Sequence, residues 1–368
     1  MKKYFDICAT TPIDKKVLNF LTKESKKVFG NPSSIHGFGQ KSKAIIERAR
    51  INVANSINCS PNEVIFTAGG SISNNMALMG TLKKGDHLIT SSYEHPAILN
   101  VAQNLKKLGV TVSLIKPDKD GIINPSKIES DIKPNTKLIS IMYVNNEIGT
   151  KNPIDEISQI AKKHKIIFHT DAVQAMGKIK LDMKTINIDL MSLSGHKFYA
   201  PKGIGVLYVK EGTLIKPILF GGGQESDLFP GTENIVNIGA IGLAAKICTE
   251  NIDEDISKVE KLDAYFIKLL DEHNIEYSIN GKSRAPGIIN ISLLDTKSTS
   301  FIINLDKEGF AVSAGSACAS GSTKASNTLK EIGLNDKLAS KSYRISFSKF
   351  HSKKDIKKLF ELIKKNIK

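Results

Sequence analysis

From residue 64 to residue 209, the chain alternates between short apolar runs and longer stretches whose apolar residues recur every three or four positions. The short runs predict strands at 64–67, 87–91, 110–115, 138–143, 166–170, 190–193 and 205–209. Helical periodicity lies between several of them, near 73–81, 97–108 and 154–164. This alternation is typical of an α/β fold, in which a mostly parallel sheet carries helices on both faces.

The pattern differs on either side of this region. Before it, we expect an extended segment at 4–12 and helices at about 15–29 and 37–58. After it, we expect a long helical stretch at 235–273, strands near 288–293 and 343–347, and a lysine-rich amphipathic helix at 353–367. These elements predict a large domain at 15–255 and a smaller α+β domain formed by 1–14 and 256–368.

Composition supports a folded protein of this size. The 368 residues are 40% apolar, and this length exceeds the usual size of a single domain. No apolar run approaches the roughly 20 residues that are needed to span a bilayer. The first residues, Met-Lys-Lys-Tyr-Phe-Asp6, reach an acid before a signal-peptide core could form, so we expect a cytoplasmic protein.

The formal net charge of +15 raises the hypothesis of nucleic-acid binding. However, the lysines are scattered along the chain, and aromatic residues make up only 6% of it. Arginine, the preferred reader of bases, occurs only at Arg48, Arg50, Arg284 and Arg344. Diffuse lysine of this kind usually reflects a solvated surface, so direct nucleic-acid binding is kept only as a secondary hypothesis.

Lys197 follows a buried apolar strand and a glycine, in the run Ser192-Leu-Ser-Gly-His-Lys197. Gly195 allows a sharp turn at the strand end, so His196 and Lys197 are expected at the edge of the sheet. A lysine held there can lose its proton by desolvation and attack a carbonyl to form a Schiff base. Taken alone, it is more often an ordinary loop lysine, and the neighbouring motifs favour the reactive interpretation.

Asp171, in the run Phe168-His-Thr-Asp-Ala-Val-Gln174, also follows a strand. Alone, an aspartate there is as often a helix N-cap as a functional group. Because Asp171 and Lys197 both follow strands, both are expected at the edge where α/β proteins bind ligands. A carboxylate beside a reactive lysine suits a pyridine cofactor, since the acid keeps the ring nitrogen protonated while the lysine holds the aldehyde.

Further strand ends carry groups that suit such a cofactor. In the glycine-rich turn at 66–75, the backbone N–H groups of Gly70 and Ser71 and the Ser71 hydroxyl predict an anion site at a helix N-terminus. His95 can stack on a planar ligand and exchange protons. Asn145 or Asn146 can bond a phenolic oxygen, although each of these features also occurs in purely structural turns.

The chain also offers a thiol and an isolated arginine. Cys318 is at the centre of a run of glycine, serine and alanine at 313–323, which has little to bury, so we interpret it as a reactive thiol. The four cysteines are far apart and form no CxxC pair, so neither a zinc site nor a disulfide framework is indicated. Arg344 enters a strand in a chain that otherwise uses lysine, and its planar fork favours a carboxylate ligand over a structural salt bridge.

Together these residues resemble the cysteine desulfurases of the NifS/IscS type, in the class-V aminotransferase family. The shared motifs extend over nearly the whole chain. They are Asp6 with Ala9-Thr-Thr-Pro12, Gly30-Asn-Pro-Ser-Ser34, Ser73-Asn-Asn75, Glu94-His95, Asn145-Asn-Glu-Ile-Gly149, His169-Thr-Asp171, Ser194-Gly-His-Lys197 and Gly315-Ser-Ala-Cys318. The resemblance implies fold type I of the transferases that depend on pyridoxal phosphate, with a mixed, mostly parallel sheet in the large domain and a smaller α+β domain.

The resemblance also implies how the cofactor is held. Pyridoxal 5'-phosphate would be attached to Lys197, with Asp171 on its ring nitrogen and His95 stacked on its ring. The other implied contacts are Gln174 and Asn145 near the phenolic oxygen, and Ser71, Ser194, His196 and the partner subunit's Thr232 at the phosphate. The implied protein is therefore a homodimer.

For catalysis, the resemblance implies that Arg344 and Asn145 bind the carboxylate of L-cysteine. Lys197 or His95 would move the α-proton, and the Cys318 thiolate would take the substrate sulfur as a persulfide. The products would be L-alanine and sulfur for an acceptor protein, in iron–sulfur cluster assembly or in tRNA thiolation.

Some residues depart from the family pattern. Ser226, Phe229 and Pro230 replace the usual residues, two of them arginines, and Ile7 and Cys8 replace the commoner asparagine and alanine. The cofactor motifs are unaffected. Three other functions stay open: a selenocysteine lyase, a small-amino-acid aminotransferase, which needs no thiol, and a catalytically weakened partner protein that binds the cofactor.

Overall fold

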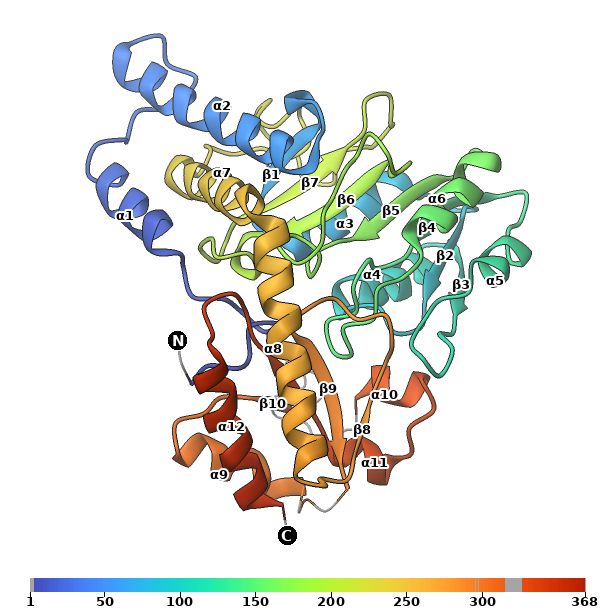
Figure 1. The fold of residues 1–368 in the computed structure, drawn as a ribbon. Helices are drawn as coiled ribbons and strands as arrows, with labels where there is room; N and C mark the ends of the chain where they lie inside the picture. Colours follow the sequence, from blue (N-terminus) through green and yellow to red (C-terminus); the bar gives the residue numbers. More distant parts are fainter. Residues whose placement is uncertain (1–2, 295, 297, 315–325, 368) are drawn as a thin grey trace.

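The computed structural model describes residues 3–294, 296, 298–314 and 326–367. A larger lobe built on a seven-stranded sheet lies above a smaller lobe built on a four-stranded sheet (Figure 1). The strand order of the larger sheet is β1-β7-β6-β5-β4-β2-β3. These strands are β1 (Val64–Thr67), β2 (His87–Ser91), β3 (Thr111–Ile115), β4 (Thr136–Ser140), β5 (Ile167–Asp171), β6 (Leu190–Ser194) and β7 (Gly205–Val209).

The larger sheet is mostly parallel, which confirms the predicted α/β class. β2 pairs in parallel with β3 and β4, β4 with β5, and β5 with β6. β7 is the exception, because it runs antiparallel to both β6 and β1. The connection from β6 to β7 contains no α-helix, and without such a crossover a following neighbour strand runs in the opposite direction.

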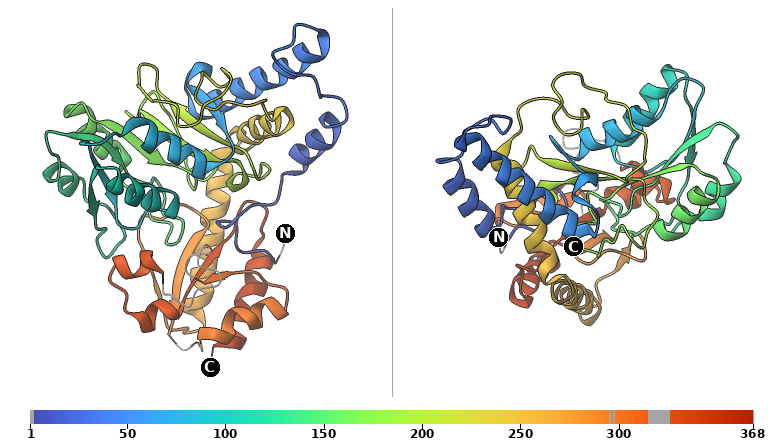
Figure 2. Two further views of the ribbon diagram at one scale, coloured as in Figure 1. Left: turned by 180° about the vertical axis from the view of Figure 1, so that it is seen from behind. Right: turned by 90° about the horizontal axis from the view of Figure 1, so that it is seen from above.

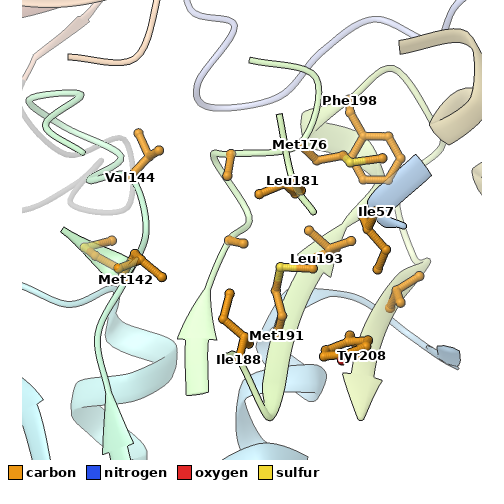
Figure 3. Close-up of a cluster of buried hydrophobic side chains, with 14 of the residues drawn as sticks. Ile57, Met142, Val144, Met176, Leu181, Ile188, Met191, Leu193, Phe198 and Tyr208 are labelled. Carbon is orange, nitrogen blue, oxygen red and sulfur yellow. The ribbon is translucent and has the colours of Figure 1, made fainter. Parts of the chain in front are cut away.

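Alternate residues of each strand face two separate hydrophobic cores. Met191 and Leu193 of β6 belong to the first core, and Leu190 belongs to the second. Figure 3 shows part of the first core, where Met191 and Leu193 lie close to Ile57 and Phe198. The helices α2 (Gly37–Ile57), α6 (Ile154–Lys163) and α7 (Ile235–Glu250) pack on the sheet face that forms this first core. The helices α3 (Gly70–Thr81) and α4 (Pro96–Lys107) cover the other face of the sheet, which is turned to the viewer in the left view of Figure 2. The short helices α1 (Lys15–Glu24) and α5 (Pro125–Ser130) complete the lobe.

The helical stretch predicted at 235–273 is confirmed, and it is divided into two helices. These are α7 and α8 (Ile252–Glu272), which meet at Asn251 with a bend of 70°. The bend has a packing reason, because α7 buries its side chains in the larger lobe and α8 buries Leu262 and Phe266 in the core of the smaller lobe. No single described helix is long and apolar enough to cross a membrane, and only this bent pair meets that test when it is taken together.

The smaller lobe has an antiparallel sheet of order β10-β11-β9-β8. Its elements are β8 (Tyr277–Ile279), β9 (Ile288–Leu293), β10 (Ser313–Ala314), β11 (Ser342–Ser346), α9 (Ser298–Lys307), α10 (Asn327–Glu331), α11 (Asp336–Ser340) and α12 (Lys353–Asn366). The N-terminal segment joins this sheet, since the Phe5 N–H donates to the Ala311 carbonyl at 2.8 Å and the Ser346 N–H donates to the Phe5 carbonyl at 2.7 Å. The domain boundaries at 14/15 and 255/256 stay a prediction.

Candidate active site

A cavity of about 570 Å³ lies at the carboxyl ends of β5 and β6, between residues of both lobes. The N-terminal segment and β11 of the smaller sheet close one side of it. Its polar and charged lining comprises Ser71, Asn74, His95, Asn146, Asp171, Gln174, Ser194, His196, Lys197, Lys202 and Arg344. The cavity therefore collects most of the residues that the strand-end motifs singled out.

Lys197 ends a short 3-10 turn that follows β6 directly. Gly195 fits tightly there, because an added Cβ would lie 3.0 Å from side-chain atoms of Ala200 and Ile204, which would have to shift slightly. The Lys197 Nζ donates to the backbone carbonyls of Cys8 at 2.6 Å and Ala9 at 2.9 Å. The N-terminal segment therefore holds the amine at the wall of the cavity.

Asp171 is the last residue of β5, and it is 5% exposed. The Asn74 side-chain amide donates to Asp171 Oδ2 at 2.7 Å, and the Val173 N–H donates to Asp171 Oδ1 at 3.0 Å. Both oxygens are thus fixed in position by neutral donors. Asn74 lies one helical turn after Gly70 on α3, so it connects the glycine-rich turn to the aspartate. The sequence predicts no role for Asn74, although it belongs to the motif Ser73-Asn-Asn75. Its spacing of four residues from Gly70, which places both on one face of the helix, is the signal that indicates such a role.

The glycine-rich turn forms the N-terminus of α3, which begins at Gly70. A Cβ on Gly70 would lie 2.7 Å from Val173 Cγ2 and 3.2 Å from Ser194 Cβ, so only glycine lets the helix approach β6 this closely. The exposed Ser71 side chain and the Ser194 hydroxyl lie at the same end of the cavity. Free N–H groups and the helix dipole make this end suitable for a phosphate.

His196 adds a neutral ring to this end of the cavity. Burial, together with the charges of Lys197 and Lys202, lowers the pKa of His196 to about 4. Its Nδ1 lies 3.1 Å from the Thr10 hydroxyl. At neutral pH, His196 is therefore a hydrogen-bonding group, and Lys202 and Lys197 are the nearby cations.

His95 caps α4, and its Nδ1 accepts the Ala97 N–H at 3.1 Å. When the ring is neutral, its proton must therefore be on Nε2. Behind it, the Glu94 carboxyl is buried and accepts from the Ser91 hydroxyl at 2.6 Å and from the Met142 N–H at 2.9 Å. Burial raises the pKa of Glu94 to about 8, which favours the neutral acid there at neutral pH.

Arg344 reaches the cavity from β11 and is 1% exposed. One terminal nitrogen donates to Asp6 Oδ1 at 2.7 Å, and the other donates to the Asn146 carbonyl at 2.7 Å. A buried guanidinium with this support can bind an anionic group in the cavity through its remaining N–H groups.

Comparison with known proteins identifies the family. The sequence pattern of the family Aminotransferase class-V matches residues 3–359. The chain belongs to the class-V aminotransferase family. It is 40% identical over 370 residues to a cysteine desulfurase IscS of Dictyoglomus turgidum, covering 99% of this chain and 94% of that protein.

Solved structures of similar proteins have the same fold. A NifS-like protein has a TM-score of 0.92 and 30% identity, covering 99% of both chains. SspA in complex with cysteine has a TM-score of 0.84 and 36% identity, covering 95% of this chain and 100% of that one. The fold predicted from the resemblance is thereby confirmed.

Class-V aminotransferases depend on pyridoxal phosphate, and the cavity residues fit this cofactor. Asn74, Gln174 and Arg344 line the cavity, and each has one buried side-chain atom without a hydrogen-bond partner among the described residues, namely Asn74 Oδ1, Gln174 Oε1 and Arg344 Nε. Unpaired polar groups beside a cavity favour a polar ligand there. The cavity also combines an anion site, an amine and a carboxylate, which are the three groups that the phosphate, aldehyde and ring nitrogen of the cofactor require.

One predicted site residue is wrong. Asn145 does not line the cavity: it is fully buried, and its Oδ1 accepts the N–H groups of Glu147 at 2.8 Å and Ile148 at 3.0 Å. The turn after β4 needs these two bonds, so the first asparagine faces inward and Asn146 lines the cavity instead. The sequence offered both residues side by side, with no signal to separate them.

Another predicted residue, Thr232, is not among the described residues that line this cavity. Thr232 lies in an exposed part of the segment between β7 and α7. Within one subunit it is not part of the site, so its predicted role depends on a second subunit. Cys318 lies outside the described residues. Gln174 is in the cavity, and its Nε2 donates to the Cys8 carbonyl at 2.9 Å.

Proposed function

We propose that this class-V aminotransferase is a cysteine desulfurase, which converts L-cysteine to L-alanine and leaves the sulfur as a persulfide on Cys318. The observation that carries the proposal is the placement of Lys197, Asp171 and Arg344 around one cavity. An amine, a carboxylate and a guanidinium there suit the aldehyde and ring nitrogen of pyridoxal phosphate and the carboxylate of an amino acid. The names of the similar proteins support the choice of cysteine.

The geometry supports an assignment of the cofactor residues. The Lys197 amine would form the covalent link, and Asp171, held by Asn74 and Val173, would keep the ring nitrogen protonated. Bound pyridoxal phosphate supplies a ring that stabilises negative charge at the substrate Cα. Gly70, Ser71, Ser194 and His196 are proposed for the phosphate, Gln174 for the phenolic oxygen, and His95 for the face of the ring.

Substrate binding and sulfur transfer use the other side of the cavity. Arg344 and Asn146, in place of Asn145, are proposed to hold the carboxylate of L-cysteine. Lys197 or His95 would take the α-proton of the substrate and later return a proton to Cα. The Cys318 thiolate then attacks the substrate sulfur, so that an S–S bond forms and the Cβ–S bond breaks. The electron pair left at Cβ takes up a proton to give alanine.

A homodimer is part of this proposal. Several large apolar side chains are exposed in the regions 29–38 and 214–220, among them Phe29 at 74%, Ile35 at 95% and Phe220 at 88%. Apolar side chains exposed to this degree favour burial against another protein surface. In the dimer, the exposed Thr232 contributes its hydroxyl to the phosphate site of the other subunit.

We further propose that the enzyme acts in the cytoplasm and passes its sulfur to an acceptor protein, either an iron–sulfur scaffold or a tRNA-thiolation protein. The test is a pair of incubations of the purified enzyme, one with L-cysteine and one with L-selenocysteine, each with a thiol reductant and pyridoxal phosphate. Equimolar alanine and sulfide are expected. Keto acid formation in place of sulfide indicates an aminotransferase, activity confined to selenocysteine indicates a lyase, and cofactor binding without any product indicates a weakened partner protein.

Arg344→Lys is expected to raise KM for L-cysteine about 10- to 100-fold, because a lysine keeps the charge but loses one charge-assisted hydrogen bond of a two-point contact. Bound cofactor should be unchanged, as measured by its absorbance. The control is Arg284→Lys, since Arg284 donates to the Ile288 carbonyl and lies 4.0 Å from Asp263 in the smaller lobe. Loss of cofactor with an unchanged KM contradicts the substrate role and makes Arg344 a residue of the fold.

A further inference from the structure

We propose that the Arg50–Glu225 ion pair positions Thr232 for the cofactor site of the second subunit. The inference rests on the homodimer and the Thr232 role of the proposed function, and it adds two positioning residues, Glu225 and Gln224. Both lie in the segment that departs from the family pattern. Neither residue lines the cavity of its own subunit.

The pair is buried and two-pronged. Arg50 Nη2 lies 2.6 Å from Glu225 Oε1, and Arg50 Nη1 lies 3.0 Å from Glu225 Oε2. The two side chains are 14% and 4% exposed. Glu225 Oε2 also accepts the Phe66 N–H of β1 at 2.7 Å, and the guanidinium lies 4.9 Å from the centroid of the Phe66 ring. Glu225 is therefore anchored to both α2 and the larger sheet.

This anchor holds a segment that has no regular structure of its own. Among the described residues, no helix or strand lies between β7 and α7. Glu225, Ser226 and Asp227 have φ values of 49°, 57° and 63°, a left-handed backbone that non-glycine residues rarely adopt. Such a backbone persists only where surrounding contacts enforce it, and the Glu225 side chain makes those contacts.

The Gln224 side chain connects the anchored residue Glu225 to the backbone next to Thr232. The Gln224 Oε1 accepts the N–H of Gly231 at 2.9 Å, which fixes the residue directly before Thr232. Glu225 therefore fixes the start of the loop 225–231, and Gln224 fixes its end. Thr232 is exposed, and its position follows from the backbone that these two side chains fix.

The lack of positive charge in this segment explains why the position of its hydrogen-bond donors matters. Residues 217–245 contain neither lysine nor arginine. A cation attracts a phosphate over several ångströms, whereas a hydroxyl or N–H donor must lie within a narrow range of distance and angle. A segment that offers only such donors to the partner's phosphate needs a rigid internal support.

The first test is Glu225→Gln, which keeps the shape of the side chain but removes its charge. The dimer should stay intact by analytical ultracentrifugation, while Kd for pyridoxal phosphate rises about tenfold or more. Gln224→Ala should raise Kd in the same direction without touching the ion pair. The control is Asp253→Asn, which breaks the exposed Lys180–Asp253 pair and should leave Kd unchanged. An unchanged Kd in both test variants, or a monomeric Glu225→Gln protein, overturns the inference.

The second test uses mixed dimers in which one subunit carries Lys197→Ala and cannot form the covalent adduct. With Glu225→Gln on that same subunit, the single competent site receives the misplaced Thr232, so more pyridoxal phosphate is needed to form the borohydride-trapped adduct. With Glu225→Gln on the opposite subunit, trapping should match that of the parent mixed dimer. The reverse pattern assigns Glu225 to its own site and overturns the inference, while leaving the proposed function intact. A wild-type enzyme that forms no adduct overturns both.

Discussion

Replacing Lys197 with alanine is expected to remove the borohydride-reducible adduct and to slow alanine formation from L-cysteine more than about 1,000-fold. The variant should still bind pyridoxal phosphate, because Asp171, Ser194 and the N-terminus of α3 are unaffected. Mass spectrometry of the reduced protein measures the adduct, and equilibrium dialysis measures the bound cofactor.

The size of this effect follows from the position of the amine. The Lys197 Nζ is held at the wall by the carbonyls of Cys8 and Ala9, at 2.6 and 2.9 Å, and alanine leaves no amine at that point. Lys202 lines the same cavity, five residues after Lys197 in the chain. Lys180→Ala is the matched control, since Lys180 is exposed and pairs only at the surface, with Asp253 at 2.8 Å. An adduct that survives Lys197→Ala assigns the covalent link to another lysine, with Lys202 the first to test.

The second large effect is expected from Cys318→Ser. This variant should bind the cofactor and L-cysteine normally, because Lys197, Asp171 and Arg344 are intact. It should form alanine at least about 100-fold more slowly and yield no persulfide by mass spectrometry, since a hydroxyl is a far poorer nucleophile than a thiolate toward sulfur.

Described residues on both sides of Cys318 are tied to the site. Ser313 pairs with Arg344 across β10 and β11, and the Ser326 hydroxyl donates to the Glu147 carboxylate, next to Asn146. Cys318 itself lies outside the described residues, four positions after Ala314 in the sequence.

The other cysteines provide controls of different strength. Burial raises the pKa of Cys59 and of Cys248 to about 12, so both remain thiols at neutral pH, and their replacement by serine should not change alanine formation. Cys8 is the described cysteine that lines the cavity. Undiminished activity in Cys318→Ser together with loss in Cys8→Ser transfers the sulfur role to Cys8, and undiminished activity in both excludes the persulfide mechanism.

Much of the fold is local in origin, and for this reason it could be predicted from the sequence. Apolar runs of strand length, and the helical periodicity between them, indicate which faces of the strands and helices are buried. Because β5 and β6 are parallel neighbours, their carboxyl ends place Asp171 and Lys197 in one cavity. The resemblance added Arg344 to this group, although it lies in the other lobe.

Features that depend on distant packing could not be predicted. The break at Asn251 reflects two separate cores, and no local signal distinguishes it from a continuous helix. Whether Asn145 or Asn146 faces the cavity is decided by the two N–H groups that the turn must satisfy. The Arg50–Glu225 pair joins residues 175 positions apart, and only the folded chain brings them together.

The N-terminal segment gives the chain an order of assembly. Residues 4–14 are synthesised early, yet Asp6 finds its partner in Arg344, 338 positions later, and the Phe5 carbonyl accepts the N–H of Ser346. The same segment supplies the two carbonyls that hold Lys197 and the Thr11 N–H that donates to the His196 carbonyl at 2.8 Å. While β11 is still inside the ribosomal exit tunnel, residues 4–6 have no partner strand in the smaller sheet. We therefore expect the Cys8 and Ala9 carbonyls to be fixed beside the lysine only after β11 has emerged, and cofactor attachment to follow translation.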